Sequence, residues 1–108
     1  MKLPTEVFGD VVVVHTPEEL GADTAGQLET FLTSQERNNV IVDLDGTETI
    51  DSGGLEALVG AQEALRALHG DLKISTSNPA NLKILEITRL DQQLEVFDTV
   101  IDAVKSFA

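Results

Sequence analysis

The sequence contains no cysteine, which excludes a disulfide scaffold, a thiolate zinc site and a cysteine nucleophile. It also lacks any apolar run near the roughly 18 residues that a membrane-spanning helix needs. The opening segment, Met1 to Thr5, has no signal-peptide hydrophobic region. Together these absences predict a cytoplasmic protein that is not inserted in a membrane.

Basic residues are scarce, because 7 lysines and arginines stand against 19 aspartates and glutamates, for a formal net charge of −12. A surface with this charge repels the phosphates of nucleic acids and anionic lipid headgroups. We therefore expect no direct nucleic-acid binding, and we expect basic protein partners to be attracted. The acidic charge also helps to keep a domain soluble.

Hydrophobic residues make up 42% of the chain and form short runs separated by charged residues, as in a folded globular protein. The length suits one domain, which we expect to span residues 1–108. Apolar runs predict strands, and apolar residues at helical spacing predict helices. The predicted strands are at about 6–8, 11–14, 40–42, 72–74 and 94–97, and the predicted helices are at about 24–35, 52–68, 79–88 and 100–107.

Strands that alternate with helices predict an α/β sandwich with parallel strand neighbours. A hairpin at Gly9–Asp10 makes the sheet mixed. We therefore expect a mixed sheet of four to five strands with about four helices. Three pairs of residues mark helix ends. Thr24 and Gln27 have the spacing of a capping box, with Asp23 as a competing N-cap. His69 and Gly70 are a basic residue in the last turn and a C-cap glycine, and Asn78–Pro79 are an N-cap followed by a proline.

A D-x-D-G-T motif, Asp43–Thr47, follows the apolar run Val40–Val42. It resembles the first motif of haloacid-dehalogenase-type phosphatases, where one aspartate attacks phosphorus and the second transfers a proton beside Mg²⁺. Other parts of that site are missing, because Asp91 and Asp98 stand alone and form no acidic pair. An Asp43 phosphatase therefore stays only a remote alternative, and we predict neither a metal site nor a cofactor.

A second motif, Ile50–Leu55, leads into the long predicted helix. Ser52 lies at or just before the helix start, where backbone N–H groups lack partners and the helix dipole favours negative charge. A phosphate on its hydroxyl would add about −1.5 to −2 units of charge facing those donors. Ser52 is also suited to be an ordinary N-cap, with Gly53 and Gly54 required for a tight turn. These residues alone leave both roles open.

The two motifs and their spacing resemble the STAS family, the sulfate transporter and anti-sigma factor antagonist domains. The family pattern is an apolar strand, a D-L-x-G loop, and I-D-S-x-G-L at the start of a helix. Val40–Gly46 and Ile50–Leu55 match it, and Ser77–Pro79 and Val96–Phe97 look like parts of the family's second half. Because the order is similar from about Val11 onward, the resemblance implies a single STAS domain.

The resemblance implies a regulatory protein rather than an enzyme, namely an anti-sigma factor antagonist. Its implied partner is a serine kinase that is also the anti-sigma factor. The unphosphorylated form would bind this kinase and free the sigma factor, and phosphorylation at Ser52 would release the kinase. The partner-binding residues that carry over are Asp51, Ser52, Gly53, Gly54 and Asp23.

The sequence departs from the family pattern at two positions. Gly53 stands where many members have a second serine or threonine. Gly21 stands where members commonly have an aspartate, for which Asp23 is the expected substitute.

The resemblance leaves an alternative, a STAS accessory subunit of a lipid-transport ABC complex in which Ser52 is unmodified. The oligomeric state stays open. We expect structural roles for His15 and His69, and we expect a surface loop at Ser75–Ser77. In a parallel arrangement of the strands this loop would border Ser52.

Overall fold

Five strands form a mixed sheet in the order β1-β2-β4-β6-β7 in the computed structural model, which describes residues 1–107. β1 pairs antiparallel with β2 through a hairpin at Gly9, whose φ of 60° is left-handed. The other neighbouring strands are parallel. The strands are β1 Thr5–Phe8, β2 Val11–His15, β4 Asn39–Asp43, β6 Asp71–Ser75 and β7 Val96–Phe97.

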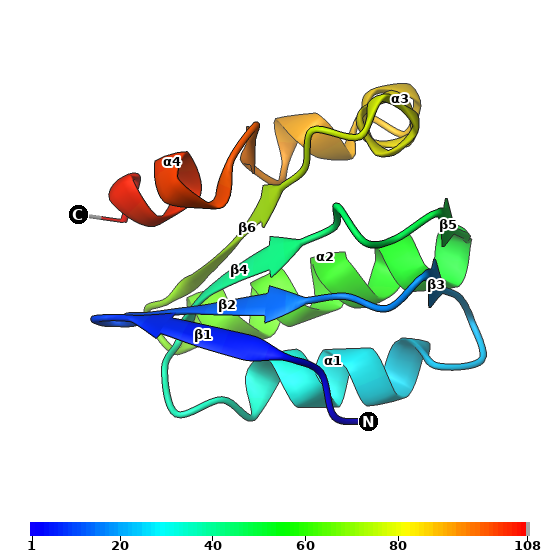
Figure 1. Ribbon diagram of the computed structural model, residues 1–108. Helices are drawn as coiled ribbons and strands as arrows, with labels where there is room; N and C mark the ends of the chain where they lie inside the picture. The colour runs from blue at the N-terminus through cyan, green and yellow to red at the C-terminus, as the bar shows by residue number, and fades with distance from the viewer. Residues whose placement is uncertain (108) are drawn as a thin grey trace.

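Helices cover both faces of this sheet. α1 and α2 pack on one face, and α4 packs on the other (Figure 1). α3 lies beyond the carboxyl end of β6 and is followed by a 3₁₀ turn, η1. The helices are α1 Ala25–Thr33, α2 Ser52–Ala67, α3 Pro79–Ile87 and α4 Val100–Lys105, and η1 is Leu90–Gln92.

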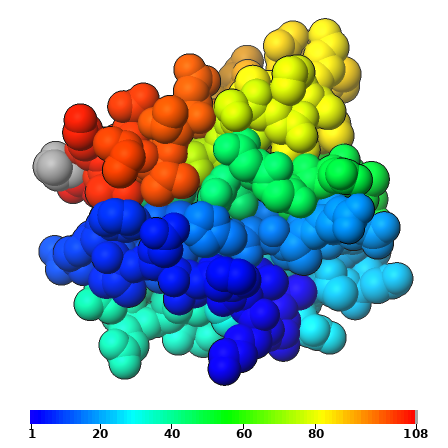
Figure 2. All heavy atoms as spheres, viewed as in Figure 1, coloured from blue at the N-terminus to red at the C-terminus, as the bar shows by residue number. Residues whose placement is uncertain are grey.

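Alternation along β2 divides the core between the two faces of the sheet. Val12 and Val14 pack with residues of α1 and α2, whereas Val11 and Val13 pack toward Ala103 of α4. β2 and β4 are therefore buried on both faces, which explains their continuous apolar sequences. Figure 2 shows the β1–β2 hairpin at the surface between α1 and α4.

The predicted fold class is confirmed, with a mixed sheet of five strands and four helices. The prediction missed a second sheet, in which β3 Glu19–Leu20 pairs in parallel with β5 Thr49–Ile50. Both strands lie in segments that were predicted as loops. Strands of two residues are too short to produce a recognisable alternation of apolar and polar residues.

Two predicted helix ends are wrong. Thr24 precedes α1, but its ψ of 4° is not the extended value of an N-cap, and its hydroxyl donates to the carbonyl of Gly21, so no side-chain cap forms. At the end of α2, His69 rather than Gly70 has the left-handed φ, at 65°. Gly70 is needed for close packing instead, because a Cβ there would lie 2.0 Å from the carbonyl oxygen of Asn38.

The predicted start of α3 is confirmed, because the Asn78 side chain accepts from the N–H of Ala80 at 2.8 Å and Pro79 follows it. Among residues 1–107, no helix combines the length and the apolar composition required to cross a membrane.

Candidate functional site

The strands β3 and β5 bring two loops together beyond the carboxyl ends of β2 and β4 (Figure 1). Directly after β5, the backbone N–H of Asp51 donates to the carbonyl of Leu20 at 3.0 Å. The chain then enters α2 without an intervening loop. The start of α2 is therefore fixed against the segment that follows β3.

Asp51, rather than Ser52, caps α2. Its Oδ1 accepts from the N–H of Gly54 at 3.0 Å, and its Oδ2 accepts from the N–H of Ala22 at 3.1 Å. The backbone donors, Gly54 first and Ala22 second, hold the pKa of the Asp51 carboxyl below its usual value. One carboxylate thus joins the first turn of α2 to the loop after β3.

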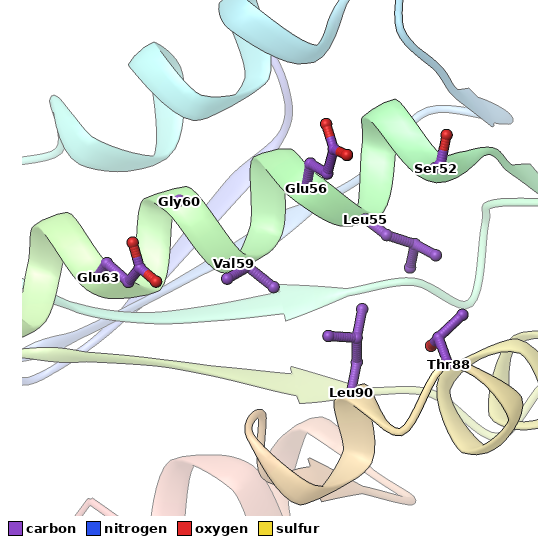
Figure 3. A pocket seen from close by; sticks show the side chains of 8 residues that line it. All are labelled: Ser52, Leu55, Glu56, Val59, Gly60, Glu63, Thr88 and Leu90. Carbon is purple, nitrogen blue, oxygen red and sulfur yellow. The ribbon is translucent and has the colours of Figure 1, made fainter.

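Ser52 is the first residue of α2, and it is exposed. Within residues 1–107 its hydroxyl has no hydrogen-bond partner, since the capping bond is made by Asp51. The N-cap alternative for Ser52 is therefore wrong. Figure 3 shows its side chain at one end of α2.

The two glycines after Ser52 serve close packing rather than a tight turn. A Cβ at position 53 would lie 2.5 Å from the Cα of Ala22, and a Cβ at position 54 would lie 2.7 Å from the carbonyl oxygen of Leu20. Neither glycine has a positive φ. The backbone of residues 20–22 approaches α2 so closely that a second hydroxyl-bearing side chain at position 53 has no room.

Asp23 and Asp51 line one hollow of about 420 Å³ between the segments 19–24 and 49–51. Asp23 is exposed there. A Cβ at Gly21 would lie 3.0 Å from Oδ2 of Asp51, so glycine leaves room for the bond between Asp51 and Ala22. Asp23 thus shares this hollow with Asp51, the cap of α2.

The carboxylates of the D-x-D-G-T motif are bound within the fold. Oδ2 of Asp43 lies 2.8 Å from Nδ1 of His15. Oδ1 of Asp43 accepts from the N–H of Asp45 at 3.0 Å. Oδ1 of Asp45 accepts from the hydroxyl of Thr76 at 3.1 Å and from the N–H of Ser77 at 2.7 Å. The loop after β6 thus contacts Asp45. Thr76 is buried and Ser77 is exposed, so the surface loop expected at 75–77 is exposed only in part.

Thr47, which ends this motif, is fully buried. Its hydroxyl donates to the carbonyl of Pro17 and shares a hydrogen bond with Thr16. The Nδ2 of Asn81, on α3, donates to the carbonyls of Leu44 and Thr47 at 3.0 and 3.1 Å. These bonds fix the loop between β4 and β5 to both neighbouring segments.

His15 lies between two carboxylates, with Nε2 at 2.6 Å from Glu6 and Nδ1 at 2.8 Å from Asp43. Partial burial lowers its pKa, but the hydrogen bonds and charges of Glu6 and Asp43 outweigh this, so the pKa is raised above 6.5. The sequence predicts only a general structural role for His15. The parallel register, which sets His15 opposite Asp43, would have identified its partner.

The loops around Ser52 carry charge of one sign. Residues 16–23 and 44–51 contain six carboxylates and no lysine or arginine, and the six are Glu18, Glu19, Asp23, Asp45, Glu48 and Asp51. Within residues 1–107, no group of three or more metal-ligating side chains is gathered in one place. The surface is therefore suited to a basic partner.

Comparison with known proteins agrees with this fold. A family model described as the STAS domain matches residues 2–103. A protein of Thermotoga neapolitana named as an anti-sigma factor antagonist is 24% identical in an alignment of 106 residues, and the match covers 94% of this chain and 94% of its own.

Solved structures match over nearly the whole chain. An anti-sigma factor antagonist from Mycobacterium paratuberculosis has a TM-score of 0.83 and 25% identity, over 97% of this chain and 92% of its own. The Bacillus cell fate determinant SpoIIAA, in its phosphorylated form, has a TM-score of 0.72 and 18% identity, over 99% and 100%. The family resemblance is confirmed: this chain belongs to the STAS domain family.

Proposed function

We propose that this protein is a partner-switching regulator of the anti-sigma factor antagonist type. In this proposal it binds a serine kinase that is also an anti-sigma factor, and binding frees the sigma factor. The kinase then phosphorylates Ser52, and the phosphorylated protein dissociates. Such a switch works beside the transcription machinery, so the proposed location is the cytoplasm.

The observation that carries the proposal is that Asp51, and not Ser52, makes the capping hydrogen bond of α2. Asp51 caps α2, and Ser52 has an exposed hydroxyl without a hydrogen-bond partner among residues 1–107. A kinase can therefore reach this oxygen without breaking the helix cap. The names of the relatives support the same class of function, and a phosphorylated form is known for the similar Bacillus protein.

A phosphate on Ser52 would find little compensation within the chain. The N–H of Gly54 is already bonded to Asp51, and residues 16–23 and 44–51 contain no lysine or arginine. A basic residue, Arg89, stands between Thr88 and Leu90, which line a hollow together with Ser52. The phosphate would therefore remain at the surface, where it adds about −1.5 to −2 units of charge. A kinase holds the phosphates of its nucleotide against the acceptor oxygen, so a phosphorylated Ser52 would face like charge in the docked complex.

We infer that the protein is regulatory rather than an enzyme. In the Asp43 phosphatase alternative, an aspartate oxygen must be free to attack phosphorus. Both oxygens of Asp43 are engaged, one with His15 and one with the N–H of Asp45. For the ABC accessory alternative, the name of the Thermotoga relative gives no support.

The test is phosphorylation by the serine kinases of the source organism, with the modified residue mapped by mass spectrometry. We expect phosphate on Ser52 in the wild-type protein and in Thr49→Val, which removes a nearby exposed hydroxyl as a matched control. Ser52→Ala should take up no phosphate. Labelling that persists in Ser52→Ala, or a wild-type protein that no such kinase labels, would refute the proposal.

A further inference from the structure

A groove runs along α2 on the side facing η1. It has a volume of about 390 Å³, and Ser52 lies at one end of it. Leu55, Val59 and Leu90 form its apolar part, and Figure 3 shows Leu55 and Val59 extending from α2 toward Leu90. From Ser52 to Glu63 it follows three turns of α2, roughly 16 Å at 1.5 Å per residue.

Acidic residues of α2 also line the groove. Glu56 and Glu63 are exposed, lie two helical turns apart on α2, and belong to no ion pair among residues 1–107. None of the residues that line the groove is basic. An apolar strip is thus bordered by two carboxylates that have no partner within the described part of the chain.

This charge argues against a second copy of the chain as the occupant. Each copy carries a net charge of −12, so self-association would bring acidic surfaces together. Much of the small basic complement is already used in ion pairs, namely Arg37, Arg66, Lys73 and Lys83. The occupant must supply positive charge as well as an apolar surface.

We propose that the groove binds an amphipathic helix of the partner protein, and this proposal rests on the function proposed above. One or two large aliphatic side chains of that helix fill the space between Leu55, Val59 and Leu90. Lysine or arginine residues beside them pair with Glu56 and Glu63. A length of three turns matches the i, i+4, i+7 anchors by which helices bind in grooves.

The position of Ser52 at the end of the groove couples docking to modification. A partner helix seated on Leu55 and Val59 brings the kinase that carries it next to the Ser52 hydroxyl. The groove thus supplies affinity that does not depend on the phosphoacceptor itself. A kinase that uses it should bind Ser52→Ala as tightly as the wild-type protein.

The test measures how tightly the kinase that labels Ser52 binds four forms of the full chain, namely the wild type, two double variants and one single variant. We expect Glu56→Lys/Glu63→Lys to weaken binding about tenfold or more, because it places like charges against the basic partner. The matched control, Asp10→Lys/Glu36→Lys, makes the same change in net charge at exposed residues outside the groove. It should weaken binding about twofold or less, through loss of long-range attraction alone.

The fourth form, Val59→Thr, adds a hydroxyl to the apolar strip at nearly constant size and should weaken binding about fivefold. The groove proposal fails if Glu56→Lys/Glu63→Lys weakens binding no more than its control while Ser52 is still labelled. In that case the proposed function stands. Failure of every kinase to label wild-type Ser52 refutes the proposed function instead.

If no kinase labels Ser52, a peptide titration tests the groove independently. The probe is a synthetic helix with leucines on one face and flanking lysines, added to ¹⁵N-labelled protein. We expect chemical-shift changes at Leu55, Val59 and Leu90, and at least tenfold weaker binding when the lysines are replaced by glutamates. Equal binding of both peptides, shifts elsewhere, or dimerisation of the protein through this face would overturn the proposal.

Discussion

The two motifs beyond the carboxyl ends of the strands, Asp43–Thr47 and Asp51–Leu55, contain similar residues but use them differently. In the first motif, both aspartates and the threonine are bonded to neighbouring segments. In the second motif the aspartate accepts two hydrogen bonds, but the hydroxyl of Ser52 makes none within residues 1–107. The first motif therefore holds together the loops at the carboxyl ends of the strands, and the second leaves one exposed hydroxyl without a partner in the described residues.

An acidic motif at the end of a strand does not by itself indicate catalysis. A side chain is available for chemistry only when the fold does not already use its polar atoms. Asp43 resembles a catalytic residue in sequence, yet its hydrogen bonds to His15 and the Asp45 backbone give it a structural role. Substitutions that treat the two motifs alike should therefore have unlike effects.

Alanine at the glycines of the two motifs should give the largest contrast. Gly53→Ala places a Cβ 2.5 Å from the Cα of Ala22, whereas a Cβ at Gly46 meets only the carbonyl oxygen of Thr16, at 3.4 Å. We expect Gly53→Ala to lower the free energy of unfolding by about 2 kcal/mol. Gly46→Ala should change it by about 0.5 kcal/mol or less. Urea unfolding measures both, and equal effects would contradict the close packing at α2.

Removing the buried hydroxyl of the first motif should have the next largest effect. Thr47→Val leaves the carbonyl of Pro17 without its donor, and we expect a loss of about 1–2 kcal/mol in the free energy of unfolding. Thr49→Val is the matched control, because Thr49 is exposed in β5. A Thr47→Val protein as stable as this control would show that the hydrogen bond contributes nothing.

In the second motif, substitutions of two adjacent residues should affect stability differently. Asp51→Ala removes the cap of α2 and its link to Ala22, so we expect a lower melting temperature. Ser52→Ala removes no hydrogen bond made by residues 1–107, so we expect an unchanged melting temperature. Thermal unfolding followed by circular dichroism tests the pair. A destabilised Ser52→Ala protein would mean that the serine has a structural role.

The smallest expected effect is a pH dependence from His15 at the edge of the first motif. Because Glu6 and Asp43 raise its pKa above 6.5, its contribution to stability is fully present below pH 6.5. That contribution is lost as the pH rises through the folded-state pKa. Glu6→Gln should make the decline in unfolding free energy above pH 6.5 shallower.

Glu18→Gln, which removes an exposed carboxylate that does not contact His15, is the control and should keep the wild-type slope. If Glu6→Gln leaves the slope unchanged, Glu6 does not raise the pKa of His15.

The fold was predictable because apolar runs such as Val11–Val14 and Val40–Val42 identify central strands directly. The predicted helix ends were less reliable, because Thr24 and Gly70 fit their patterns while tertiary contacts decide their conformations. The pairing of β3 with β5 involves only two residues on each strand, so no periodicity could show it.

The candidate site was predicted in part. The sequence located Ser52 at the start of a helix, but it could not assign the cap, since Asp51 and Ser52 are both good N-cap residues. The close approach of residues 20–22 explains Gly53 and Gly54, and it depends on a contact between segments about thirty residues apart. The groove could not be predicted from the sequence, because only the tertiary fold brings Leu90 close to Leu55 and Val59.

The most direct test of the central claim compares the affinity of the kinase for the protein before and after complete phosphorylation of Ser52. We predict that phosphorylation weakens binding about a hundredfold, which corresponds to about 3 kcal/mol. Ser52→Ala, treated in parallel with kinase and ATP, should keep the affinity of the unphosphorylated protein. Equal affinity of the phosphorylated and unphosphorylated forms would contradict the account, because Ser52 would then not be the switch.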